Sequence, residues 1–169
     1  MRYRLDVVAR DVTEVVTFAG GWLVDRVMAG WDVTVLISGD DDVRPLEILG
    51  VRIQDLEAAL DDWTDRPHPQ TVAVAADLFA TDERVRRGVL GALDQGMTEV
   101  TLWGERCPAE LDSTVGTVHH QLSAAARAFK AQALAATPSA GAVAVAETET
   151  FRCGLAALPS VAADLIPAS

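Results

Sequence analysis

The sequence predicts a three-layer, doubly wound α/β fold in which helices cover both faces of a mostly parallel, five-stranded sheet. Segments with strand character alternate with segments of helical character along the 169 residues, which is typical of βαβ units. The strand segments are continuous apolar runs, as expected for strands that are buried on both faces. A flavodoxin-like and a Rossmann-like strand order both fit this alternation. Because the length is that of one ordinary domain, we expect a single α/β domain over residues 1–169.

The first strand and the first helix have the clearest signals. Residues 3–9 form a mostly apolar run that predicts a strand. Asp11 then offers a helix N-cap, and Glu14 follows three residues later, as in a capping box. Apolar residues recur at helical spacing over residues 12–29, and Gly30 is a natural stop. This helix is therefore the first crossover of the predicted sheet.

The next part of the chain predicts two strands and a helix. Residues 32–37 are rich in β-branched side chains and predict the second strand. Pro45 and Gly50 bracket residues 46–49, which predicts a short extra strand. Residues 52–60 place their apolar side chains on one side of a helix. A loop then leads to the second half of the fold.

The middle of the chain repeats the same pattern. Residues 71–76 are small and β-branched and predict a buried strand. Thr81 or Asp82 offers the N-cap of a helix that ends near Gln95. Residues 98–103 predict the strand that follows this helix. These elements add a further βαβ unit to the parallel sheet.

The last third predicts one long helix and a final strand. An apolar stripe at helical spacing favours a single helix over residues 112–136. His119 and His120 would lie on that helix and point in different directions, so they would not bind one metal ion together. Residues 142–146 predict the last strand, and a short helix is expected in the tail.

The charge balance argues against nucleic-acid binding. The chain has 14 Lys and Arg residues and 25 Asp and Glu residues, so its formal net charge is −11. Binding to a phosphate backbone needs a basic face. The sequence has no apolar run long enough for a transmembrane helix, and its first residues do not read as a signal peptide. We therefore expect no membrane partner and a cytoplasmic location.

The two cysteines, Cys107 and Cys153, form neither a disulfide framework nor a zinc motif. Two free thiols in a reducing compartment fit this pattern. Cys107 follows the fourth main strand beside Arg106, but no partner base for nucleophilic catalysis is identifiable. The catalytic residues, if there are any, are unknown from the sequence.

The predicted fold itself indicates where a ligand would bind. Open parallel sheets bind ligands outside the carboxyl ends of the strands, at the point where the strand order reverses. In a flavodoxin-like order this crevice lies between the first and the third strand. Arg10 and Asp11 would then face Asp77 and Thr81, and the loop that contains Asp40 would border the crevice.

The standard cofactor motifs are absent. A dinucleotide site needs glycines directly after the first strand, but residues 9–12 contain none, and there is no P-loop. The acidic run of residues 40–42 could hold Mg²⁺, although a solvated loop is the better interpretation. We therefore assign no cofactor and no metal site.

The function predicted from these observations is a non-catalytic module that binds a protein partner or a second copy of itself. Failed motif tests and an acidic composition favour this reading. Trp63, in the longest loop, is the candidate interface residue, because exposed tryptophans mark interfaces. The alternative is an enzyme or sensor that binds a small ligand or Mg²⁺ in the crevice at the carboxyl ends of the strands.

Overall fold

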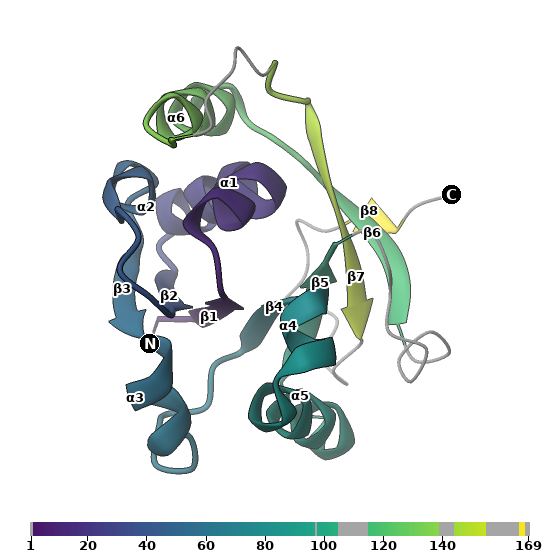
Figure 1. Ribbon diagram of the computed structural model, residues 1–169. Coiled ribbons are helices and arrows are strands. Elements are labelled where there is room, and N and C mark those ends of the chain that lie inside the picture. Colours follow the sequence, from purple (N-terminus) through teal and green to yellow (C-terminus); the bar gives the residue numbers. More distant parts are fainter. Residues whose placement is uncertain (1, 97, 105–114, 139–143, 155–165, 168–169) are drawn as a thin grey trace.

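The computed structural model describes residues 2–96, 98–104, 115–138, 144–154 and 166–167. Within these ranges one sheet of eight strands runs in the order β3-β2-β1-β4-β5-β7-β6-β8 (Figure 1). Its parallel part contains β3 (Arg52–Asp55), β2 (Asp32–Ile37), β1 (Arg4–Ala9), β4 (Thr71–Ala75) and β5 (Glu99–Trp103). An antiparallel extension follows, made of β7 (Thr148–Gly154), β6 (Val115–Gln121) and β8 (Ile166–Pro167).

Helices lie on both faces of this sheet (Figure 1). One face carries α1 (Val12–Met28), α2 (Arg44–Ile48) and α6 (Ala124–Ala135). The other carries α3 (Leu56–Asp61) and α5 (Glu83–Gln95), with α4 (Ala76–Thr81) packed against α5. The prediction of a three-layer α/β fold with a mostly parallel sheet is therefore confirmed. The predicted number of five strands is too small, and the sheet is mixed rather than parallel throughout.

The local signals of several helices act as the sequence predicts. The Asp11 side chain accepts a hydrogen bond from the backbone N–H of Thr13 at 2.7 Å and so caps α1. Asp82 caps α5 in the same way, through Arg84 N at 2.9 Å. Gly96 ends α5 with a φ of 66°, a left-handed conformation that glycine adopts at little cost.

Two elements before β4 differ from the prediction. Residues 46–49 lie largely in the short helix α2, because Pro45 is favoured in a first helical turn. The predicted helix over residues 52–60 divides at Asp55 into the edge strand β3 and the helix α3. The Asp55 side chain accepts a hydrogen bond from Ala58 N at 3.0 Å, so it is the N-cap that the sequence reading overlooked.

The predicted long helix over residues 112–136 is also wrong. In the described part of this span, residues 115–121 form the strand β6 and residues 124–135 form the helix α6. The Ser123 hydroxyl caps α6 by accepting a hydrogen bond from Ala126 N at 3.0 Å. β-Branched side chains, which favour strands, occur in this segment at Val115, Thr117 and Val118. Hydrogen bonding to β7 then makes the segment a strand and not part of a helix. Of the strand predicted over residues 142–146, the described residues 144–146 lie outside any strand; β7 (Thr148–Gly154) follows them and is antiparallel to β5.

The extension is anchored to α1 by a buried ion pair. The Lys130 ammonium on α6 lies 2.6 Å from a carboxylate oxygen of Glu149 on β7, and both side chains are almost fully buried. The Glu149 carboxylate also accepts hydrogen bonds from Gly21 N at 2.9 Å and Trp22 N at 2.6 Å, in the middle of α1. Lys130 donates in addition to the carbonyl oxygen of Thr17 at 2.7 Å. Two backbone donors and one acceptor of α1 are thus bound by side chains from outside the helix.

The glycine pair inside α1 permits this close packing. A Cβ atom built at Gly21 would lie 2.2 Å from Leu122, far inside van der Waals contact. At Gly20 the nearest atom, on Lys130, would be 3.5 Å away, which is an ordinary contact. Only the second glycine is therefore required by the packing of α1 against the segment before α6.

None of the helices in the described ranges has the length and apolar character that crossing a bilayer requires.

Candidate functional site

The order of the strands reverses between β1 and β4. The chain runs from β1 outward to β2 and β3, and then returns to place β4 on the other side of β1. The carboxyl ends of β1 and β4 are therefore the switch point at which open α/β sheets bind their ligands. Six residues at these strand ends, called here the carboxyl-end cluster, are Arg10, Asp11, Glu14, Asp77, Thr81 and Trp103.

Glu14 is the central side chain of this cluster. It lies in the first turn of α1, is half-buried, and accepts a hydrogen bond from the indole Nε1–H of Trp103 at 3.1 Å. Burial raises the pKa of Glu14, and the nearby carboxylates of Asp77 and Asp11 raise it further. The hydrogen bond from Trp103 and the charge of Arg10 oppose this rise only in part. A carboxyl group of this kind can give or take a proton nearer neutral pH than an ordinary glutamate.

The cationic part of the cluster is the guanidinium of Arg10. Its Nη2 atom donates a hydrogen bond to the hydroxyl of Thr81 at 2.7 Å, and that hydroxyl donates to the carbonyl oxygen of Asp77 at 2.9 Å. This chain of contacts connects the end of β1 to the end of α4. Since the Arg10 side chain is exposed, it can bind an anionic group while it keeps this position.

The two aspartates of the cluster have local backbone partners. One carboxylate oxygen of Asp11 accepts from the first turn of α1, as described above. Asp77 lies in the first turn of α4, where its Oδ1 accepts a hydrogen bond from Leu78 N at 2.9 Å. Both side chains are exposed at the strand ends, and both are near enough to raise the pKa of Glu14.

The structure therefore brings together four of the residues that the sequence placed at the crevice: Arg10, Asp11, Asp77 and Thr81. Asp40 does not join them. It lies in the exposed loop after β2, and no contact within the cluster involves it. Across the described ranges, no group of three or more His, Cys, Asp or Glu side chains is arranged to hold a metal ion. Cys107 lies outside the described residues.

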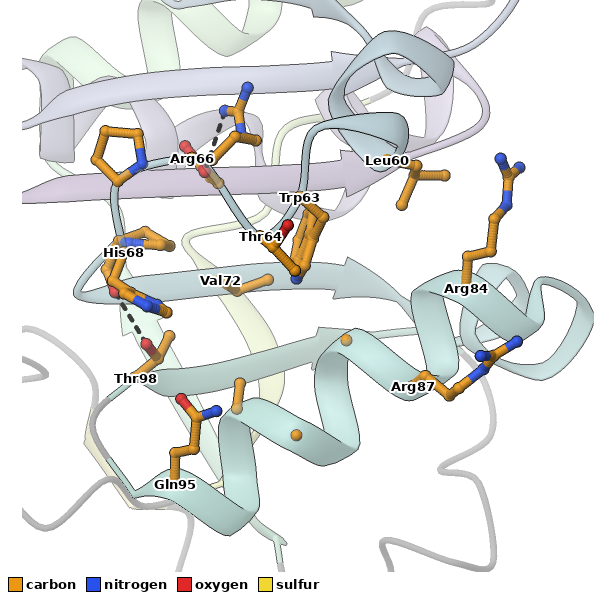
Figure 2. A pocket seen from close by; sticks show the side chains of 16 residues that line it. Leu60, Trp63, Thr64, Arg66, His68, Val72, Arg84, Arg87, Gln95 and Thr98 are labelled. Carbon is orange, nitrogen blue, oxygen red and sulfur yellow. Dashed lines mark hydrogen bonds and ion pairs between the residues drawn. The ribbon is translucent and has the colours of Figure 1, made fainter.

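Trp63 lies away from this cluster, in the loop between α3 and β4. Its side chain is half-buried and is in contact with α5, where Gly88 leaves room for the indole. Figure 2 shows Trp63 in the wall of a cavity between this loop and α5. The structure thus places the predicted interface residue at a hollow rather than on a flat exposed patch.

Another group of polar side chains, made of Asp25, His120 and Ser123, joins α1 to β6 and α6. His120 Nε2 lies 2.7 Å from one carboxylate oxygen of Asp25, and the Ser123 hydroxyl donates to the other at 2.5 Å. The aspartate binds both the serine and the histidine, whereas in a nucleophilic triad the histidine stands between the serine and the acid. Since Ser123 also caps α6, this group has a structural role.

Sequence reasoning missed the two central members of the carboxyl-end cluster. It assigned Glu14 to a capping box, whereas the Glu14 carboxylate contacts Trp103 across the sheet edge. It placed Trp103 at the end of a predicted strand, whereas the buried ring of this residue donates its Nε1–H into the cluster. One signal was present: an acidic residue one turn after the first strand lies at the same sheet edge as the predicted crevice.

Among the comparisons with known proteins, only the one with solved structures gives matches to this chain. No protein-family model matches the chain, and no curated protein matches it. The chain is similar to the A40926 pseudoaglycone deacetylase Dbv21, with 15% identity, a TM-score of 0.61, and coverage of 94% of this chain and 100% of that one. It is similar to a deacetylase from teicoplanin biosynthesis, with 15% identity, a TM-score of 0.61, and coverage of 90% and 98%. GalB, the 4-carboxy-2-hydroxymuconate hydratase of Pseudomonas putida, has 12% identity, a TM-score of 0.62, and coverage of 90% and 95%.

These similarities correct the predicted function class. The sequence favoured a non-catalytic interaction module because the standard catalytic motifs are absent. The solved structures named here, which share this fold over nearly their whole length, are deacetylases and a hydratase, so the absence of short motifs does not indicate a non-catalytic module and that prediction is wrong. Short motifs could not reveal this, because the likeness lies in the fold, at 12–16% sequence identity.

Proposed function

We propose that this chain is an enzyme whose active site is the carboxyl-end cluster, with Glu14 as the residue that transfers a proton. The observation that carries the proposal is the position of Glu14, a half-buried carboxyl group of raised pKa at the switch point of the sheet. Titratable groups with perturbed pKa values concentrate at functional sites, because proton transfer is most efficient when the pKa lies near the working pH.

The similar enzymes suggest the class of reaction. Deacetylation by hydrolysis and hydration of a double bond both join the oxygen of water to an unsaturated carbon. In this chain the Glu14 carboxylate would take a proton from water while the water oxygen bonds to that carbon. In hydrolysis the same proton then passes to the leaving amine nitrogen as the C–N bond breaks. In hydration a proton passes to the neighbouring carbon instead.

The substrate that fits this cluster is a small polar molecule with an anionic or carbonyl group. Arg10 would bind that group, because its guanidinium is exposed beside the Thr81 hydroxyl. The carboxylates of Asp11 and Asp77 would raise the pKa of Glu14, which makes its carboxylate a stronger base toward water, and they would contact donor groups of the substrate.

Two assays test the proposal. Acetate release is measured on a panel of N-acetylated amines, and loss of absorbance is measured on a panel of unsaturated carboxylates, each with and without added Mg²⁺. The Glu14→Gln variant should lower kcat by about 10²–10⁴-fold, the usual contribution of a general acid–base residue. The matched control is Glu47→Gln, which alters an exposed carboxylate on α2. Turnover that is unchanged in a folded Glu14→Gln protein would contradict the proposal.

A further inference from the structure

We propose that the cavity between the α3–β4 loop and α5, called here the α5 cavity, is a second binding site for a small organic anion with a flat apolar body. This inference does not depend on the proposed function. The cavity lies beside the starts of β4 and β5, as Val72 and Thr98 in its wall show (Figure 2), whereas the carboxyl-end cluster lies at their ends.

The α5 cavity has the size of a small-molecule site. Its volume is about 530 Å³, and ligand pockets in proteins commonly measure roughly 300–1,000 Å³. One wall is the loop of residues 62–70, the opposite wall is α5, and strand β4 contributes Val72 to the floor (Figure 2). A molecule of two fused rings would fit between these walls.

The loop wall is held in place before any ligand binds. The Arg66 guanidinium donates to Gln54 on β3 at 2.8 Å and to the Asp6 carboxylate on β1 at 3.3 Å. The Thr98 hydroxyl donates to the carbonyl oxygen of Pro69 at 3.0 Å. The loop is therefore held by contacts to β1, to β3 and to the residue before β5. A preformed wall reduces the conformational entropy that the loop would lose when a ligand binds.

The inner surface of the cavity suits a flat apolar body. The indole of Trp63 is one side of it, and the indole is held so close to α5 that a Cβ atom at Gly88 would approach it to 3.3 Å. At Gly91, one helical turn further, an added Cβ atom would meet no described heavy atom within 4 Å. The space above Gly91 is thus open beside an aromatic ring, and aromatic faces favour stacked planar partners.

The charge of the lining favours an anion. Three arginines and one carboxylate line the cavity, whereas the chain as a whole has a net charge of −11. The carboxylate, Asp6, is already paired with Arg66 and lies 3.8 Å from the guanidinium of Arg4. Among the lining side chains positive charge is therefore in excess, although carboxylates outside the lining (Glu57, Asp82 and Glu83) pair with Arg84 and Arg87.

Among these arginines, Arg87 is the one available to a ligand. Arg84 makes two hydrogen bonds to Glu57, at 2.9 and 3.0 Å, and so joins α5 to α3. Arg87 is 74% exposed, and its Nε lies 3.7 Å from Glu83, beyond hydrogen-bonding distance. An anionic group at the mouth of the cavity would replace this weak surface contact with a charge-assisted hydrogen bond.

The test uses 2-naphthoate as the probe and 2-naphthalenemethanol as its uncharged analogue, with binding measured by calorimetry on the full chain. We expect 2-naphthoate to bind more tightly than the alcohol. Gly91→Leu fills the open space and should weaken 2-naphthoate binding by about tenfold or more. Arg87→Gln should weaken it by about two- to fivefold and reduce the preference for the anion. The control Arg127→Gln, on α6 across the sheet, should leave binding unchanged.

Three outcomes would overturn this inference. The first is no measurable binding of 2-naphthoate. The second is equal binding of the alcohol and the anion. The third is unchanged binding in Gly91→Leu, whose fold is checked by its circular dichroism and thermal unfolding. Glu14→Gln should bind 2-naphthoate like the unchanged protein, so failure of this inference and failure of the proposed active site are distinguishable.

Discussion

The indole Nε1–H of Trp103 donates a hydrogen bond to the carboxylate of Glu14 across 3.1 Å, although 89 positions separate the two residues in the chain. The contact joins the last residue of β5 to the first turn of α1. Burial of Glu14 at this edge of the sheet raises its pKa, the carboxylates of Asp77 and Asp11 raise it further, and the hydrogen bond from Trp103 offsets this rise only in part. Glu14 thereby becomes a group whose ionisation opposes folding.

Glu14→Gln should raise the melting temperature at neutral pH. Because the folded-state pKa of Glu14 lies above its unfolded value, the protonated form stabilises the fold below about pH 4, and this stability is lost as the pH rises through the folded pKa. Glutamine keeps an acceptor for Trp103 but has no charge to bury. Thermal unfolding across pH measures the difference, which should disappear in acid. The Glu47→Gln control should show no such pH-dependent gain, and a gap that is constant with pH would contradict the argument.

The glycines of α1 should respond in opposite ways to alanine. Gly21→Ala places a methyl group 2.2 Å from Leu122 and should cost about 1–3 kcal/mol through overpacking. Gly20→Ala meets only ordinary contacts and should stabilise the helix by about 0.5–1 kcal/mol. Denaturant unfolding of both variants provides the comparison. If Leu122→Ala fails to relieve the cost of Gly21→Ala in the double variant, then the steric explanation is wrong.

Lys130→Met should be strongly destabilising. It leaves the Glu149 carboxylate buried without its cationic partner, and breaking a buried pair in this way costs about 3–5 kcal/mol. The double variant Lys130→Met with Glu149→Gln removes both charges and should recover part of the loss. Chemical denaturation measures the four free energies of unfolding in this cycle. For the exposed pair of Arg127 and Glu147, 3.9 Å apart, Arg127→Met should cost about 0–1 kcal/mol. A similar cost at both sites would contradict the role of burial.

Asp25→Asn should destabilise the protein at neutral pH but not in acid. Burial opposes the ionisation of Asp25, yet hydrogen bonds from Ser123 and His120 bring its pKa below the ordinary value. A lowered folded pKa stabilises the fold above the unfolded pKa of about 3.9, and this stability is lost as the pH falls through the folded pKa. We expect a loss of about 1–3 kcal/mol near pH 7. Urea unfolding at neutral and acid pH tests this, and a loss that persists below both pKa values would show that packing is the cause.

Several elements of the fold could be read from the sequence because their signals are local. Asp11 and Asp82 cap the helices that they were expected to cap, and Gly96 ends α5. The β-branched runs of β2 and β4 left no helical alternative. Each of these signals depends on neighbouring residues of the chain alone, which is why it survives without knowledge of the tertiary structure.

In the last third of the chain, the spacing of apolar residues fits a helix as well as a strand, and long-range contacts decide which of the two forms. Val118 and Leu122 have helical spacing, yet Val118 lies in β6, because pairing with β7 satisfies the backbone of residues 115–121. Asp55 and Ser123 are the N-caps of α3 and α6. Because Asp and Ser are common N-cap residues, the starts of these two helices carry a signal in the sequence.

By itself, the sequence determined the α/β class, the main parallel strands and the sheet edge to which Arg10, Asp11, Asp77 and Thr81 belong, because apolar periodicity and capping are properties of short segments. Only the tertiary structure decided that β6 and β7 extend the sheet in antiparallel fashion, that Trp103 meets Glu14, and that Trp63 and Gly88 shape a cavity along α5. Those relationships join residues that are far apart in the chain. Their energies come from burial and charge that exist only when the layers are packed together.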